Sequence, residues 1–225
     1  QDLSGRPRFL VRTFLLSYGF YSWGIPLALD LHGKDAQIIA LVTGSAGFLA
    51  PFSLTSRHPV SQTAASFSGH LGTTGIAHGV LLHELLFGAE GSGRGALALA
   101  VAGSMGGLAG GFAFGQRSTL SAGSAEVISL GGDYGLLMGL GSAHLFGILD
   151  EDYRREFAAS ALIGSGLGYW GGRSLARRHA YTRGDAEVLS TVAALGAFAA
   201  AATVNLVGGV EEEKAYTAAV MAGSA

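Results

Sequence analysis

The chain has 225 residues and a formal net charge of -2; 49% of its residues are hydrophobic, 13% are charged, 37 are glycine and none is cysteine. Soluble domains carry about 25% charged residues, so this composition indicates that lipid rather than water surrounds much of the chain. The near-neutral charge and the lack of basic runs interleaved with aromatics argue against a nucleic-acid partner, and the lack of cysteine excludes disulfides, thiolate metal sites and cysteine nucleophiles.

Apolar stretches of about 20 residues, the length that crosses a bilayer, follow one another along the chain. They are far longer than the roughly 4–8 residues of a buried strand and show no alternation of period 2, so they predict helices. Two of them, 63–87 and 122–149, have the same length but more polar content. The expected helices cover residues 9–29, 36–55, 63–87, 95–116, 122–149, 157–176 and 186–209, with an incomplete helix from about 215.

Capping residues mark where three of these helices begin. Ser61, Ser121 and Thr182 each follow a basic turn and precede an apolar stretch, as N-cap residues do. Asp185 stands three residues after Thr182, which is the offset of a capping box.

A unit of about 60 residues repeats along the chain. The dipeptide Gly-Ser recurs inside apolar stretches at spacings of 59, 61 and 59 residues, starting at Gly44, Gly103, Gly164 and Gly223. A fixed period predicts one supersecondary unit, here a helical hairpin, whose copies pack on one another. We expect one repeat domain, 1–225, made of an N-terminal half-unit 9–33, units 36–88, 95–149 and 154–209, and the start of a fourth unit at 211–225. The two partial units could complete a fourth hairpin and close a ring of eight helices.

Small residues four positions apart recur at equivalent places in the units, as in Gly75/Gly79 and Gly106/Gly110. In lipid, such pairs let helix backbones approach closely, whereas each glycine would cost about 1 kcal/mol inside a water-exposed helix. The predicted fold is therefore all-α, with Gly-rich helical-hairpin repeats forming a polytopic membrane bundle of 7–8 helices. A soluble, Gly-packed helical repeat is the alternative.

The loops expected on one side of the membrane differ in charge from those expected on the other side. If every stretch crosses once, the N-terminus and the loops 55–62, 117–121 and 173–185 share one side and hold most of the arginines, while the acidic runs lie opposite. The positive-inside rule then puts the N-terminus in the cytoplasm. A signal peptide removed before Gln1 would instead leave that residue outside. The predicted location is a membrane, that of a bacterial cell envelope.

Several polar residues inside the apolar stretches are candidates for a pathway. Glu84, His144 and Asn205 occupy one equivalent position late in the second helix of each unit, at offsets of 60 and 61 residues. Ionisable groups in a membrane segment mark a pathway, a relay or a specific partner, although a hydrogen-bonded trio could simply join three helices. Asp133 stands mid-helix, where a carboxylate must be paired, protonated or hydrated, and His78 belongs to the most polar helix.

No catalytic motif is present, because the chain lacks a nucleophile elbow, a P-loop and an H-E-x-x-H pair. Residues 166–171 fit G-x-G-x-x-G, yet no strand precedes them. We expect no enzyme activity, cofactor or metal site.

The favoured function is a structural or assembly role in the membrane through Gly-rich helix packing. The partners would be the lipid bilayer and another copy or another membrane protein, with no nucleic acid. The alternative is a channel or carrier whose polar path is lined by Glu84, His144, Asn205 and Asp133.

Overall fold

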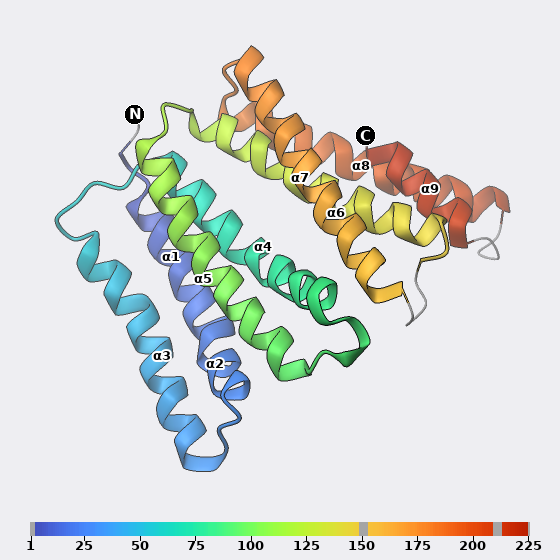
Figure 1. Cartoon of the computed structure of the whole chain (residues 1–225). Helices are drawn as coiled ribbons and strands as arrows, with labels where there is room; N and C mark the ends of the chain where they lie inside the picture. Colours follow the sequence, from blue (N-terminus) through green and yellow to red (C-terminus); the bar gives the residue numbers. More distant parts are fainter. Residues whose placement is uncertain (1–2, 149–152, 209–212, 225) are drawn as a thin grey trace. The chain divides into compact units, whose positions relative to one another are not determined.

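The computed structural model describes residues 3–148, 153–208 and 213–224, and these segments are helical apart from turns and one isolated bridge between Ser4 and Val60. The predicted all-α fold is confirmed for this part of the chain (Figure 1). Contacts divide the chain into two compact units, unit 1 with residues 1–125 and unit 2 with residues 126–225. The repeat and the number of membrane crossings stay predictions.

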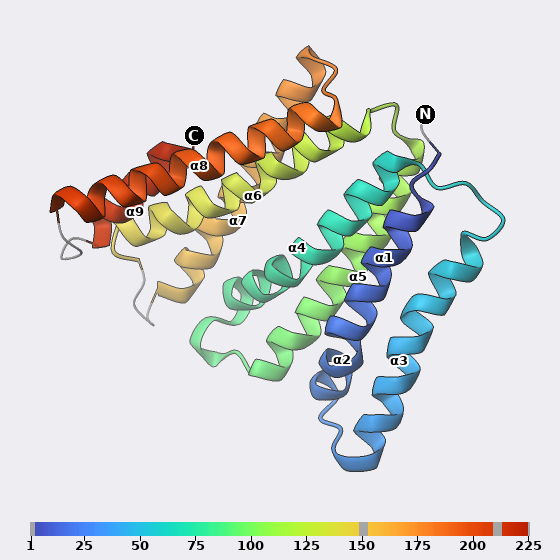
Figure 2. The same cartoon turned by 180° about the vertical axis from the view of Figure 1, so that it is seen from behind.

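Unit 1 consists of long helices joined by short turns, as Figures 1 and 2 show. Its first helix is continuous but changes its winding, because a π-helical turn over Ser17–Tyr21 separates α1 from α2. The helices are α1 (Arg6–Leu16), α2 (Ser22–Ala28), α3 (Gly33–Leu54), α4 (Gln62–Phe87) and α5 (Gly93–Arg117).

The core of unit 1 lies where α1 and α2 rest on the α4–α5 hairpin. α4 and α5 pack along their lengths, while α1 contacts α4, α2 contacts α5, and α3 packs on the outer side of α1 and α2. Phe9 is buried with Val60 at one level, and Phe20 and Tyr21 are buried against Ala100 at another. The tight pair α4–α5 therefore spans the gap between the predicted units 36–88 and 95–149.

Unit 2 contains most of α6 (Ala122–Leu145), followed by α7 (Arg154–Arg178), α8 (Arg183–Gly208) and α9 (Glu213–Ser224). α6 touches α7 through glycines, and α8 packs against α9. Arg183 is the first residue of α8. Its Nε lies 3.8 Å from Glu126 Oε1 on α6 and 3.2 Å from Glu187 Oε1 on α8, so it joins the N-terminal parts of the two helices. Of the predicted acidic runs 150–152 and 211–213, residues 150–152 and 211–212 lie outside the described residues, and Glu213 begins α9.

The predicted N-caps are confirmed. The hydroxyl of Ser61 accepts a hydrogen bond from the Ala64 N–H at 3.1 Å, and that of Ser121 accepts one from the Ser124 N–H at 3.0 Å. At Thr182 the capping box is complete: the Asp185 N–H donates to Thr182 Oγ1 at 3.2 Å, and the Thr182 N–H donates to Asp185 Oδ2 at 2.8 Å. Side chains thus satisfy backbone groups that a helix start leaves without a partner.

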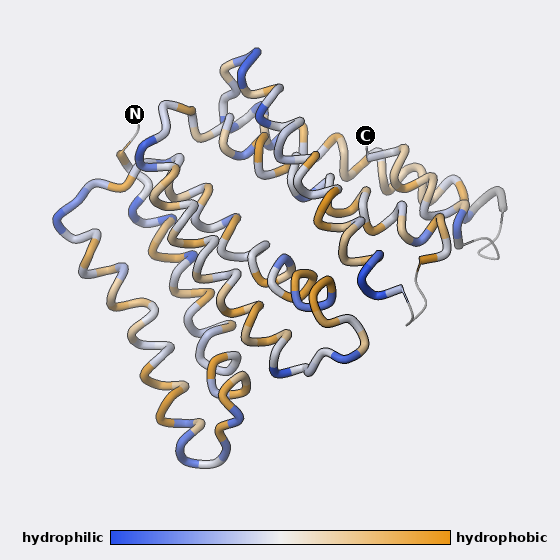
Figure 3. Tube along the Cα trace, viewed as in Figure 1, coloured by the Kyte–Doolittle hydropathy of each residue, from blue (hydrophilic) through white to orange (hydrophobic). Residues whose placement is uncertain are grey.

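In the described segments, three helices are long and apolar enough to cross a membrane, by length and composition: Gly33–Leu54, Gly93–Arg117 and Arg183–Asn205. In the most apolar 18-residue segment of each helix, 6% of α3 and 0% of α8 is buried inside the protein. Figure 3 shows polar residues at both ends of α3 and apolar residues between them. Large side chains such as Leu41 on α3, 69% exposed, and Phe198 on α8, 73% exposed, point outward within their units.

The two ends of unit 1 carry different charges. At one end the Gly5 N–H donates to the Val60 carbonyl at 2.9 Å and Gln116 Nε2 donates to the Pro59 carbonyl at 2.9 Å, which joins the start of α1, the α3–α4 loop and the end of α5. At the other end Arg94 Nη2 forms an ion pair with Asp30 Oδ1 at 2.5 Å. The first end, here called the basic end, holds Arg6, Arg8, Arg12, Arg57 and Arg117, and the opposite end holds Asp30, Lys34, Asp35, Glu84, Glu90 and Arg94.

Candidate functional site

Glycines form the contact between α4 and α5, where the two backbones touch. A Cβ built on Gly75 would lie less than 3.0 Å from the Gly103 carbonyl, and one built on Gly103 would lie as close to the Gly75 carbonyl. Backbone cannot move aside as a flexible side chain can, so no larger residue fits while the helices keep this distance. We call this row the glycine seam. In α4–α5 it consists of Gly75, Gly79, Gly103, Gly107, Gly111 and Gly115, each meeting backbone of the facing helix.

The same contact occurs in both helix pairs of unit 2. Gly135 on α6 faces the Gly164 carbonyl of α7, and Gly196 on α8 faces the Gly223 carbonyl of α9; each of the four would place a Cβ less than 3.0 Å from its partner's carbonyl. The α4, α6 and α8 members, Gly75, Gly135 and Gly196, follow one another at 60 and 61 residues. The seam glycines therefore fall at positions that the sequence period relates.

A buried serine fastens α1–α2 to the seam of unit 1. Ser104 is 0% exposed, and its hydroxyl donates to the Gly72 carbonyl on α4 at 2.6 Å. The Tyr21 hydroxyl lies 2.9 Å from Ser104 Oγ. Because the single Ser104 proton is directed at Gly72, Tyr21 is the donor in this second bond. Three helical segments thus meet at one chain of hydrogen bonds.

Replacing Tyr21 with phenylalanine is expected to lower the free energy of unfolding by about 1 kcal/mol, the usual contribution of one hydrogen bond. Ser104→Ala should cost more, about 1–3 kcal/mol, because it leaves both the Gly72 carbonyl and the Tyr21 hydroxyl buried without this partner. Thermal unfolding followed by circular dichroism measures both. Tyr18→Phe, in the same π-helical turn but 47% exposed, is the matched control; an equal loss there would contradict the assignment.

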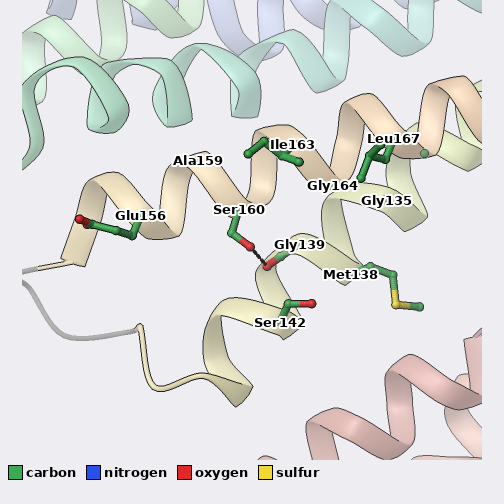
Figure 4. A pocket seen from close by; sticks show the side chains of 11 residues that line it. Gly135, Met138, Gly139, Ser142, Glu156, Ala159, Ser160, Ile163, Gly164 and Leu167 are labelled. Atoms are coloured by element: carbon green, nitrogen blue, oxygen red, sulfur yellow. Dashed lines mark hydrogen bonds between the residues drawn. The ribbon is translucent and has the colours of Figure 1, made fainter.

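A groove of about 640 Å³ lies over the seam between α6 and α7. Figure 4 shows Ser160 pointing from α7 to the Gly139 carbonyl of α6, to which its hydroxyl donates at 2.8 Å. Glu156 lies one turn before Ser160, and the remaining side chains that line the groove are mostly apolar. They include Met138, Ile163 and Leu167. This lining suits an apolar side chain or acyl chain better than a charged solute.

Two of the predicted pathway residues, Glu84 and His78, lie on α4 in unit 1. Glu84 is half-buried, with its Oε1 3.7 Å from Nδ1 of the buried His83. His78 is also half-buried, and its Nδ1–H donates to the Thr74 carbonyl one turn earlier at 2.9 Å. Since the two residues are six positions apart, they point about 120° away from each other around the helix.

The other three, Asp133, His144 and Asn205, lie in unit 2. Asp133 and His144 are half-buried on α6, and their spacing of 11 residues puts them on one face but about 16 Å apart along the axis. Asn205 is exposed on α8. The predicted layer of Glu84, His144 and Asn205 is therefore divided between the units, and a common pathway stays a prediction. In the described part of unit 2, other residues line the α6–α7 groove.

Sequence reasoning did not assign a role to Tyr21, Ser104 or Ser160, which are among the residues that make interhelical hydrogen bonds. Ser104 could have been found, because it is the second residue of the repeated Gly-Ser dipeptide. Tyr21 carries no such signal, since its position depends on the π-helical turn that shifts the following residues around the helix.

Comparison of the chain with protein-family models, with curated proteins and with solved structures finds no match.

Proposed function

We propose that this chain is an integral membrane protein with a structural or assembly role. Glycine seams hold its helices in tight hairpins, and the outward apolar faces contact lipid and a second membrane helix, from another copy or another protein. The observation that carries this proposal is the combination of backbone-to-backbone seams inside with long apolar faces outside.

The distribution of apolar residues supports lipid as the surrounding solvent. In a soluble protein, α3 and α8 would each present a continuous apolar face to water, and contiguous exposed patches of that kind mark membrane or protein contacts. α3 has 22 residues, which at 1.5 Å per residue gives about 33 Å, enough to cross a hydrocarbon core of about 30 Å.

The seams favour a structural role over transport. A contact that leaves no room for one methyl group leaves none for a solute between the paired helices. In α4–α5 the seam extends along most of the hairpin, from the level where Gly79 of α4 meets Leu99 of α5 to the level where Gly115 of α5 meets Ala64 of α4. The α6–α7 groove, where space remains, is lined largely by apolar side chains, and a second membrane helix fits such a surface.

Fractionation of cells that express the chain tests the membrane part of the proposal. We expect the protein to stay in the membrane pellet through an alkaline carbonate wash and to need detergent to remain monodisperse. Recovery as a folded, monodisperse species in plain buffer would contradict it and would favour the soluble helical repeat.

Reconstitution into liposomes tests the structural part. We expect proton and cation flux equal to that of protein-free liposomes, and the same result for Glu84→Gln and Asp133→Asn. A flux above this background that either substitution abolishes would contradict the structural role and establish the channel or carrier alternative.

A further inference from the structure

Two arginines of α1 lie against α4 one helical turn apart. Arg8 Nη1 donates to the hydroxyl of the buried Ser66 at 2.9 Å. The stem of Arg12 rests on Gly69, where a Cβ would lie 2.9 Å from Arg12 Cγ. The glycine thus makes room for the arginine stem, and the side chains of Arg8 and Arg12 both lie along one strip of the α1–α4 contact.

His70 extends this strip further along α4. It follows Gly69 directly on α4 and is half-buried. Among the described residues, no carboxylate lies within ion-pairing distance of Arg12.

We propose that Arg8 and Arg12, with His70 beside them, bind the phosphate of an anionic phospholipid. The inference rests on the proposed membrane location. Guanidinium groups bind phosphate through charge-assisted, often bidentate hydrogen bonds, and basic pockets between membrane helices hold anionic head groups. Ser66 orients Arg8, and Gly69 lets Arg12 lie close to α4.

The depth of the strip agrees with a lipid head group. α1 begins at Arg6, so Arg8 and Arg12 lie about 3 and 9 Å along its axis, and the polar zone on each side of a bilayer is about 5–8 Å thick. The long side chain of Arg12 can reach back toward the phosphate level. Val11 and Leu15 beside it are 58% and 55% exposed and would contact the acyl chains. A free anion in water would make no use of these apolar neighbours.

Lipid binding to the purified full chain in detergent, measured by native mass spectrometry, tests the proposal. The probes are phosphatidylglycerol and phosphatidylcholine with identical acyl chains. We expect phosphatidylglycerol to bind more tightly, and Arg8→Gln with Arg12→Gln to weaken it about 20- to 30-fold, from about fivefold per arginine. Arg57→Gln with Arg117→Gln removes the same charge at the same end, from exposed positions outside the strip, and should change binding less than about twofold.

Three outcomes would overturn the proposal: no preference for phosphatidylglycerol, an equal loss in the control pair, or displacement of the lipid by millimolar inorganic phosphate, which would assign the strip to a soluble anion. If the double variant does not fold, Arg12→Gln alone, expected to cost about fivefold, replaces it. A failure of the membrane proposal is distinguished by fractionation, in which the wild-type chain would be soluble without detergent.

Discussion

Replacing Gly75 with valine is expected to destabilise unit 1 by about 2–4 kcal/mol, at or above the upper part of the range for overpacked cores. The new Cβ would meet the Gly103 carbonyl at less than 3.0 Å. Relief requires α4 and α5 to move apart, and that movement would also weaken the contacts at Gly79, Gly107 and Gly111. The loss appears as a lower midpoint in thermal unfolding followed by circular dichroism, in detergent or, for a soluble chain, in buffer.

Gly106→Val on α5 is the matched control. It makes the same chemical change in the same hairpin, but a Cβ at Gly106 has nothing within 4 Å inside the chain. Valine is also the better helix former, so this variant should be as stable as the wild type or slightly more stable. Equal losses in the two variants would show that glycine is needed here for a reason other than close helix approach.

The seam in unit 2 allows an independent check of the same reasoning. Gly135→Val should behave as Gly75→Val does, since Gly135 meets the Gly164 carbonyl in the same way. Gly166→Val on α7, where a Cβ again has nothing within 4 Å, is its control. If the units fold separately, each seam variant lowers the stability of one unit only.

The sequence predicted the helices well because their signals are local. The stretch expected at 36–55 is α3, Gly33–Leu54, and that expected at 63–87 is α4, Gln62–Phe87. Capping needs only residues within one turn, so Ser61 could be recognised without knowing what α4 packs against. The helix expected at 9–29 was also found, but the sequence did not predict its π-helical turn at Ser17–Tyr21. Those five residues contain no proline and a single glycine, Gly19, so their composition does not distinguish them from an ordinary helical turn.

Helix pairing could not be read from the period alone, because a period does not say where one packed pair ends and the next begins. Taking each stretch with a Gly-Ser dipeptide as the first helix of a unit grouped 36–55 with 63–87, whereas α4 packs along its length against α5. The signal was present in the glycines: Gly75 and Gly79 need a partner with small residues at matching positions, and α5 offers Gly103 and Gly107 where α3 offers only Gly44 and Gly47.

The candidate site was less predictable than the fold. Glu84, His144 and Asn205 share a position in the repeat, but equivalent positions in successive units need not meet in space. Two of the hydrogen bonds that join helices, Tyr21 to Ser104 and Ser160 to Gly139, link residues 83 and 21 positions apart. Such contacts depend on how helices are rotated about their axes, which hydrophobic patterning leaves open in a helix apolar on nearly every face.

Single cysteines placed at the two ends of unit 1 should react with a membrane-impermeant maleimide from opposite sides of the membrane. The chain has no cysteine of its own, so each variant carries one reactive group. At the basic end we choose His58 and Thr119, and at the opposite end His32 and Glu90, all exposed in loops or short turns.

The charges of the ends give the direction of this result. Cytoplasmic loops are enriched in Lys and Arg, so His58→Cys and Thr119→Cys should be labelled in inverted vesicles but not in intact cells, and His32→Cys and Glu90→Cys the reverse. Agreement within each pair is the stricter requirement, because the hydrogen bonds between Gln116 and Pro59 and the ion pair between Arg94 and Asp30 hold each end together. Labelling of all four from both sides would contradict a membrane-spanning unit 1. Labelling of both pairs from the sides opposite to those expected would keep the membrane spans and overturn only the orientation. The experiment therefore tests two statements separately: the length of the apolar helices predicts that α3 and α5 cross the membrane, and the charges of the ends predict the direction in which they cross.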